Sequence, residues 1–213
     1  MGAMKFNLWF WAFLLAVMPV SAADTLGLKD ATVLIIRHAE KPSSGFDLTP
    51  VGYQRANAYV HYFQNFTIDG KPVTLDHLFA AADSNGSHRP RLTLEPLSKA
   101  TGLAIEQPFT AKQYAELADE LRAKPHGEHI LICWHHGDIP QFLQALGASP
   151  EKLLPHGRWP DEVFGWMIQL HYDDKGQLIE EKCINENLMP NDAGMQDDIT
   201  PLPGPTKSQG AVP

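Results

Sequence analysis

The sequence has little cysteine, no excess of basic residues and none of the common zinc-hydrolase motifs. Its two cysteines, Cys133 and Cys183, form no CxxC pair, and neither HExxH nor HxHxD occurs among the ten histidines. These absences disfavour a metal hydrolase. Lys and Arg number 17 against 25 Asp and Glu, a net charge of −8, which argues against a nucleic-acid-binding surface. An anionic ligand stays compatible with this charge, because an acidic protein can carry a locally cationic site.

Long apolar runs are also scarce, and the longest lies near the amino terminus. Residues 6–20 are mostly apolar, Lys5 precedes them, and small residues follow at Ser21 to Ala23. This order is typical of a secretory signal peptide. The run is shorter than the ~20 residues needed to span a bilayer, which disfavours stable membrane insertion. We expect residues 1–23 to be a cleaved signal peptide and the protein to be periplasmic or secreted.

Export would place the two cysteines where disulfides are permitted. Cys133 lies inside the apolar run 130–134, where a buried free thiol is the ordinary interpretation. A Cys133–Cys183 bridge is the alternative, since neighbouring strands can satisfy disulfide geometry.

The remaining chain alternates strand and helix patterns. The continuous apolar runs 32–36 and 130–134 are typical of strands buried on both faces. Thr49 and Pro50 form a helix start, with Thr49 as the N-cap. The patterns predict strands at 32–36, 77–81, 103–106, 130–134, 163–172 and 178–184, and helices at 50–64, 90–101, 111–123 and 139–146.

This alternation predicts one α/β domain over 24–198, built as a three-layer α/β/α sandwich with a mostly parallel central sheet. Residues 173–176 (DDKG) are a turn signal that joins the last two predicted strands as a hairpin. The segment 199–213 is rich in Pro and Gly and has no periodicity, so we expect a disordered tail there.

Basic residues and histidines stand just beyond three of the predicted strands. Arg37 and His38 follow the first strand, Arg89 follows the second, and His135 and His136 follow the run 130–134. Ligands of open α/β sheets bind beyond the carboxyl ends of the strands. Guanidinium groups grip phosphoryl oxygens in pairs, and a histidine oriented by a neighbour can act as a nucleophile. The sequence therefore predicts a site for a phosphoryl group.

Four segments in this region resemble the histidine phosphatase superfamily, which includes phosphoglycerate-mutase-like and acid-phosphatase-like enzymes. LIIRHAEK at 34–41 resembles the family's opening motif, and LTPVG at 48–52 resembles the LTxxG turn into its first helix. Arg89 with Thr93 resembles the second-arginine segment, and His136 with Gly137 the second-histidine segment. RHA replaces the usual RHG, a variant associated with small phosphohistidine-phosphatase-like members. The resemblance implies a phosphoglycerate-mutase-like fold.

Carried over to this sequence, the resemblance implies that His38 is the nucleophile that becomes phosphohistidine. Arg37, Arg89 and His136 would bind the phosphoryl oxygens, with no metal or other cofactor. Two positions have neighbouring alternatives: Arg91 competes with Arg89, and His135 competes with the preferred His136.

The general acid and the rim of the site are further expectations from the resemblance. Glu106 and Asp138 occupy regions in which family members carry the acid, although Asp138 is equally suited to be the N-cap of the next helix. Lys41 and Ser44 lie where family members make additional phosphate or substrate contacts, and His135 is expected near them. Glu40 is expected to form a local salt bridge.

We therefore expect a metal-independent phosphatase that hydrolyses a phosphate monoester or phospho-group through a phosphohistidine at His38. A phosphatase is preferred to a mutase because the segment between Thr93 and Glu128 is short, leaving little chain for a lid that excludes water. Its partner would be a small phosphorylated substrate or phosphate. The alternative is a non-catalytic protein of the same fold that binds a phosphorylated ligand.

Overall fold

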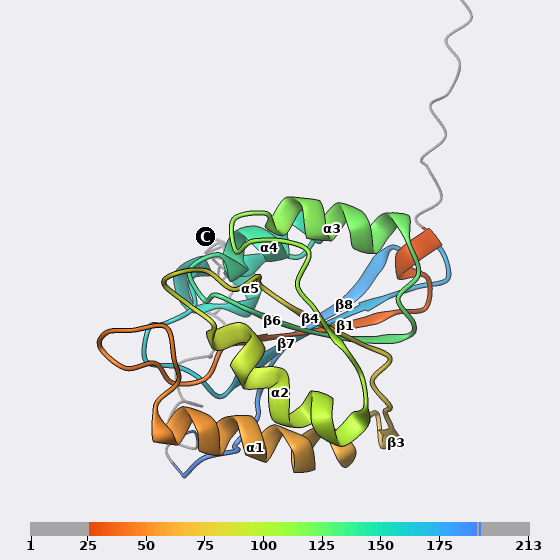
Figure 1. The fold of residues 1–213 in the computed structure, drawn as a ribbon. Coiled ribbons are helices and arrows are strands. Elements are labelled where there is room, and N and C mark those ends of the chain that lie inside the picture. Colours follow the sequence, from red (N-terminus) through yellow and green to blue (C-terminus); the bar gives the residue numbers. More distant parts are fainter. Residues whose placement is uncertain (1–25, 191, 193–213) are drawn as a thin grey trace, which may run out of the picture.

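The computed structural model describes residues 26–190 and 192 (Figure 1). The predicted signal peptide at 1–23 and the predicted tail at 199–213 lie outside the described residues. Within the described part of the chain, every helix is too short or too polar to cross a lipid bilayer.

A six-stranded sheet forms the centre of the fold, in the order β5-β4-β6-β1-β7-β8. Strands β5, β4, β6 and β1 pair in parallel, and β7 runs antiparallel to both β1 and β8. The sheet is therefore mostly parallel, as predicted. A small antiparallel pair, β2 with β3, stands apart from it. The strands are β1 (Thr32–Arg37), β2 (Thr67–Ile68), β3 (Lys71–Pro72), β4 (His77–Ala80), β5 (Ile105–Glu106), β6 (His129–Trp134), β7 (Trp166–Tyr172) and β8 (Leu178–Asn185).

Helices cover both faces of this sheet. In Figure 1, α1 and α2 lie below it, and α3, α4 and α5 lie above it. The helices are α1 (Pro50–Gln64), α2 (Arg89–Thr101), α3 (Tyr114–Ala123), α4 (Ile139–Ala145) and α5 (Pro150–Leu153), with short 3-10 turns at Leu26–Leu28 and Pro155–Gly157. The predicted three-layer α/β/α arrangement is confirmed.

Strand β1 explains why both faces of the sheet are covered. Its six residues are all buried. Val33 and Ile35 join the apolar cluster under α3 and α4, whereas Leu34 and Ile36 join the cluster under α1 and α2. Successive side chains of a strand point to opposite faces, so a continuous apolar run requires helices on both sides.

The element boundaries differ from the predicted ones mainly where polar groups end an element. Helix α3 starts at Tyr114 rather than at 111, because Gln113 closes a turn by accepting from the backbone N–H of Thr110. Strand β7 starts at Trp166 rather than at 163, since the carbonyl of Val163 accepts from side chains instead of a neighbouring strand. The Thr49 N-cap is confirmed: its Oγ1 accepts from the N–H of Gly52 at 3.0 Å.

The two cysteines are free thiols. Cys133 lies on β6 and Cys183 on β8, and β1 and β7 run between these strands. Three strand spacings amount to about 14 Å, well beyond the ~7 Å over which Cα atoms can be bridged. The alternative of a Cys133–Cys183 disulfide is therefore wrong for this fold, and the buried-thiol interpretation of Cys133 holds.

Gly52 allows α1 to pack against the chain that follows β1. A Cβ built on Gly52 would lie 2.5 Å from the carbonyl oxygen of Glu40, which is backbone and cannot rotate away. Alanine normally stabilises a helix by ~1 kcal/mol relative to glycine. We predict the opposite sign here: Gly52→Ala should lower the free energy of unfolding by ~1–3 kcal/mol, measured by urea denaturation, because the packed backbone must move.

The matched control is Gly86→Ala, where an added Cβ meets no atom within 4 Å. This variant should unfold at nearly the same urea concentration as the wild type. Equal stability of both variants would contradict the close approach of α1 to Glu40.

Candidate active site

Arg37 and His38 lie at the carboxyl end of β1, in the middle of the sheet. Both side chains are almost completely enclosed, with 0% and 1% of their surface exposed. Arg37 pairs with Trp134 of β6, and the N–H of His38 continues this ladder by donating to the carbonyl of Trp134 at 3.0 Å. The β1–β6 pairing therefore brings the residues after both strands to one place.

The His38 ring is held in one tautomer. Its Nδ1 lies 2.8 Å from the carbonyl oxygen of Ala39, an acceptor, so Nδ1 carries the proton and donates it. Burial lowers the pKa of His38 to about 2. The hydrogen bond to the Ala39 carbonyl opposes this shift, and the positive charges of Arg37 and Arg89 add to it. The ring is therefore neutral at physiological pH, and Nε2 keeps a free lone pair, the form that a nucleophile needs.

Arg37 is fixed by a loop that precedes β7. Its Nη1 donates to the carbonyls of Pro160, Asp161 and Val163 at 3.1, 2.8 and 2.7 Å, and its guanidinium lies 3.8 Å from the centre of the Phe164 ring. Burial lowers the pKa of Arg37 to about 10, so the group stays charged at neutral pH. Its Nε is buried and has no hydrogen-bond partner.

Arg89, at the start of α2, also has a buried Nε without a hydrogen-bond partner. Its Nη1 donates to the carbonyl of Gly45 at 2.9 Å. Burial lowers the pKa of Arg89, and its charge in turn lowers the pKa of both His38 and His135. Leaving a buried donor unpaired costs ~1–3 kcal/mol, so an anion that accepts from both arginines would be bound favourably.

Arg91, the alternative to Arg89, is engaged elsewhere. Its Nε donates to Asp83 at 2.9 Å, and its Nη1 lies 3.6 Å from a carboxylate oxygen of Glu95. The half-buried Arg91 guanidinium is therefore already paired with carboxylates of the loop after β4 and of α2.

The two histidines after β6 differ in what they contact. The His135 ring centre is 5.1 Å from that of His38, and the His136 ring centre is 6.4 Å away. Both nitrogens of His136 are engaged: Nδ1 accepts from Arg37 Nη2 at 3.2 Å, and Nε2 donates to Asp161 at 2.8 Å. Burial lowers the pKa of His135 to about 4 and also lowers that of His136. The geometry thus favours His135 as the ring beside His38, contrary to the preference from the sequence.

Of the two candidate acids, only Asp138 lies in this region. It is buried, its negative charge raises the pKa of His135, and it accepts from Lys112 Nζ at 2.6 Å. Asp138 occupies the N-cap position of α4, but its side chain makes no capping hydrogen bond. Glu106 is not brought to the site: its carboxylate pairs at 3.2 Å with His77, which begins β4 at the opposite end of the sheet. The structure therefore places Glu106 on the edge strand β5, away from Arg37 and His38.

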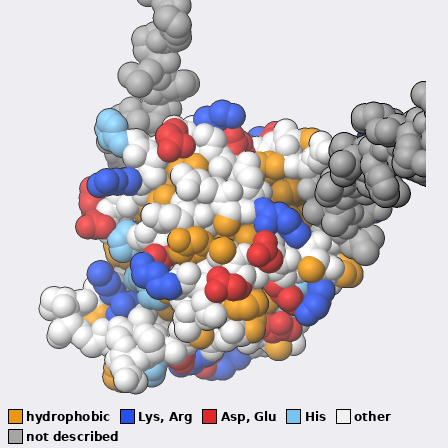
Figure 2. Space-filling view, turned by 90° about the horizontal axis from the view of Figure 1, so that it is seen from above, with side chains coloured by type: hydrophobic (Ala, Val, Ile, Leu, Met, Phe, Trp, Pro, Cys, Tyr) orange, Lys and Arg blue, Asp and Glu red, His pale blue; other side chains and the backbone are white. Residues whose placement is uncertain are grey.

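The loop between β1 and α1 forms the rim of the site. Lys41 and Ser44 are exposed on it, and the charge of Lys41 lowers the pKa of His135 and His136. Glu40 forms the expected local salt bridge, at 2.7 Å from Arg55. Figure 2 shows Lys, Arg and His side chains gathered along its left side, which is the side of this loop and of the carboxyl end of β1 in Figure 1. The acidic protein therefore has a locally cationic edge.

Sequence patterns missed the loop 160–164, which contributes three carbonyls, Asp161 and Phe164 to the site. The loop has no recognisable motif, because any residue type can supply a backbone carbonyl.

A cleft of about 460 Å³ adjoins this loop, and its lining includes His136, Gln141, Gln144, His156, Arg158 and Asp161. Among residues 26–190 and 192, no group of three or more His, Cys, Asp or Glu is arranged to hold a metal ion.

Comparison with known proteins gives structural similarity only. No protein-family model and no curated protein sequence matches this chain. The chain is similar in structure to a phosphoglycerate mutase from Plasmodium falciparum, at 16% identity and a TM-score of 0.49, over 70% of this chain and 87% of that one. It is also similar to a phosphoserine phosphatase variant from Entamoeba histolytica bound to phosphoserine, at 14% identity, a TM-score of 0.48, and 71% and 96% coverage.

A third similar structure is the protein histidine phosphatase SixA complexed with tungstate, at 14% identity and a TM-score of 0.45, over 70% of this chain and 95% of that one.

The lowered pKa of His38 predicts acid-sensitive stability. An unfolded histidine binds a proton below about pH 6.5, but folded His38 stays neutral down to about pH 2. The stabilising contribution of the neutral ring is thus complete above pH 6.5 and is lost as pH falls below it, by up to ~1.4 kcal/mol per pH unit. His38→Asn should weaken this dependence between pH 6.5 and 4, measured by urea unfolding at each pH.

The exposed His61 on α1 gives the matched control, and His61→Asn should retain the wild-type pH dependence. Parallel curves for the wild type and His38→Asn would contradict a buried neutral His38.

Proposed function

We propose that this chain belongs to the histidine phosphatase superfamily and is a metal-independent phosphatase. It would hydrolyse a phosphate monoester or phospho-group through a phosphohistidine at His38. One observation carries the proposal: the buried, unpartnered Nε–H groups of Arg37 and Arg89 accompany a neutral histidine whose Nε2 is free. A phosphoryl group supplies oxygens for both donors and an electrophile for the lone pair.

In the proposed first step, the His38 Nε2 lone pair attacks phosphorus in line with the leaving oxygen. The Nε2–P bond forms as the P–O bond to the leaving group breaks, and the leaving oxygen takes a proton from a carboxyl group. Water then attacks phosphorus, the P–N bond breaks, and the carboxylate accepts the proton. Arg37 and Arg89 stabilise the oxygens that carry the charge in both steps.

We assign the second-histidine role to His135 rather than His136. His135 is nearer to His38, and His136 has both nitrogens committed to Arg37 and Asp161. His136 would then act through Arg37, by orienting its guanidinium. For the proton transfers, the burial of Asp138 and its effect on His135 favour Asp138 over Glu106. Lys41 and Ser44 would contact the substrate from the rim.

The cleavable leader at 1–23, the domain boundaries 24–198 and a periplasmic or secreted location are part of the same proposal. Their support is the order of Lys5, the apolar run 6–20 and the small residues that follow.

Hydrolysis of p-nitrophenyl phosphate between pH 4 and 8, in the presence of EDTA, tests the reaction. The wild type should turn over, and His38→Ala should lose at least about 1,000-fold in kcat, because no other group replaces the nucleophile. A rapid quench should trap phosphate on the protein in an acid-labile, alkali-stable form. Phosphate binding without turnover would instead support the non-catalytic alternative and defeat the enzymatic one.

Paired alanine variants test the residue assignments by steady-state kinetics. Arg89→Ala should lower kcat/KM about 100-fold or more, since it removes a charge next to the transferred group, whereas Arg91→Ala should stay within about 3-fold. His135→Ala should lower kcat about 100-fold, and His136→Ala about 10-fold, because the latter acts only through Arg37. Reversal of either order would transfer the role to the other member of the pair.

A further inference from the structure

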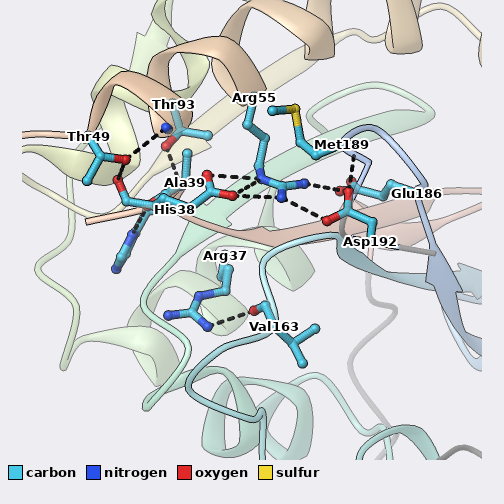
Figure 3. Close-up of polar contacts among 12 residues, drawn as sticks. Arg37, His38, Ala39, Thr49, Arg55, Thr93, Val163, Glu186, Met189 and Asp192 are labelled. Carbon is cyan, nitrogen blue, oxygen red and sulfur yellow. Dashed lines mark hydrogen bonds and ion pairs between the residues drawn. The ribbon is translucent and has the colours of Figure 1, made fainter. Parts of the chain in front are cut away.

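Arg55, on α1, joins two carboxylates that come from distant parts of the chain. Its side chain is buried, with 2% of the residue exposed. Nε and Nη2 donate to Glu40 Oε1 at 3.0 and 2.7 Å, and Nη1 and Nη2 donate to Asp192 Oδ2 and Oδ1 at 2.9 Å each (Figure 3). Both contacts have the two-pronged geometry that fixes position as well as charge.

Glu40 lies two residues after His38, and its backbone is also held. The Glu40 carbonyl accepts from the N–H and the Oγ1 of Thr49, at 2.9 and 3.3 Å, and the N–H of Ala39 donates to Thr93 Oγ1 at 2.9 Å. The carbonyl of the intervening Ala39–Glu40 peptide is the one that accepts from His38 Nδ1. Anchoring the Glu40 side chain therefore restrains the carbonyl that sets the His38 tautomer.

Asp192 connects the same guanidinium to the loop that holds Arg37. Its carboxylate occupies the space left by Gly165, where an added Cβ would lie 2.5 Å from the Asp192 Cγ. Gly165 follows Phe164, whose ring packs against the Arg37 guanidinium. The N–H of Met189 also donates to Asp192 Oδ2, at 2.9 Å. Arg55 thus stands between the chain after His38 and the chain beside Arg37.

We propose that Arg55, with Glu40 and Asp192, is a positioning unit for the reaction proposed above. It keeps the Ala39 carbonyl on His38 Nδ1, so that Nε2 retains its lone pair, and it fixes the His38 segment relative to the Arg37 loop. Arg55 touches neither the phosphoryl group nor His38 itself. This inference rests on the proposed function only for its kinetic part, because the His38 tautomer can be measured without substrate.

A purely structural role for Arg55 is the competing explanation. Buried ion pairs add little to stability compared with apolar residues of the same size. We therefore look for the effect of Arg55 in the position of the groups that it holds. The two explanations differ in one readout. A structural role changes the melting temperature alone, whereas a positioning role changes the His38 tautomer and kcat in protein that remains folded.

The variants are Arg55→Met, Arg55→Lys and the nearly isosteric Asp192→Asn. Two-bond ¹H–¹⁵N spectra at pH 7 should show wild-type His38 with its proton on Nδ1 only, and Arg55→Met and Asp192→Asn with a mixture of both tautomers. Their kcat for p-nitrophenyl phosphate should fall about 10- to 100-fold, with KM changed less than about 3-fold. Arg55→Lys should recover part of both effects, since it restores the charge without the fork.

Arg122→Met is the matched control, because Arg122 also pairs with a carboxylate, Asp119, and donates to the Ala145 carbonyl, but packs with α3 and α4 on the other face of the sheet. It should keep the wild-type tautomer and kcat even if its melting temperature falls. If Arg55→Met does not fold, Asp192→Asn decides. A wild-type tautomer and a kcat within 2-fold in the folded variants would overturn the proposal, whereas absence of turnover in the wild type would overturn the proposed function and leave the tautomer test intact.

Discussion

The hydrogen bond from His38 Nδ1 to the Ala39 carbonyl is the constraint on which the candidate site depends. It fixes where the only proton of a neutral, buried imidazole resides, and hence which nitrogen can react. The bond forms within two adjacent residues, so its geometry is set by the backbone after β1. That backbone is restrained by Thr93 on α2 and by Thr49, the N-cap residue of α1. Helices α1 and α2 therefore restrain the backbone that orients the His38 ring at the carboxyl end of β1.

Burial affects a neutral histidine and charged arginines in the same small region. It keeps His38 uncharged, yet it also encloses Arg37 and part of Arg89, whose charges disfavour protonation of nearby imidazoles. An enclosed guanidinium is tolerated because carbonyls and an aromatic ring surround most of Arg37. The donors left over, the two Nε–H groups, are the unsatisfied part of this arrangement. Oxygens of a bound anion would satisfy these donors, and the proposal that this acidic protein binds an anionic ligand rests on them.

Sequence reasoning reached the features that depend on local pattern. The apolar run before Arg37 predicted a strand buried on both faces, and Thr49 predicted the start of α1. Patterns could not distinguish His135 from His136, because the choice depends on which ring the loop 160–164 engages. The pairing of Glu106 with His77 could not be read from the pattern either, and Arg55 was missed because its partners are 15 and 137 positions away. Long-range pairs of this kind leave no periodic signal.

The route of the chain between α2 and β6 bears on the reaction proposed at His38. This segment is used for β5, at the edge of the sheet, and for α3, whose Leu117 and Leu121 pack into the cluster on the upper face. The connection that precedes α3 reaches the edge of the site: the Ala111 carbonyl accepts from Trp134 Nε1 at 3.0 Å, and Lys112 Nζ donates to Asp138 at 2.6 Å. The Asp161 side chain, bonded to His136 beside Arg37, is 90% exposed. His38 itself is only 1% exposed, so within the described residues the solvent-exposed group of this region is Asp161 and not the His38 ring. The proposed preference for hydrolysis over transfer back to a retained product therefore rests on the shortness of this segment, which leaves little chain for a separate lid that excludes water.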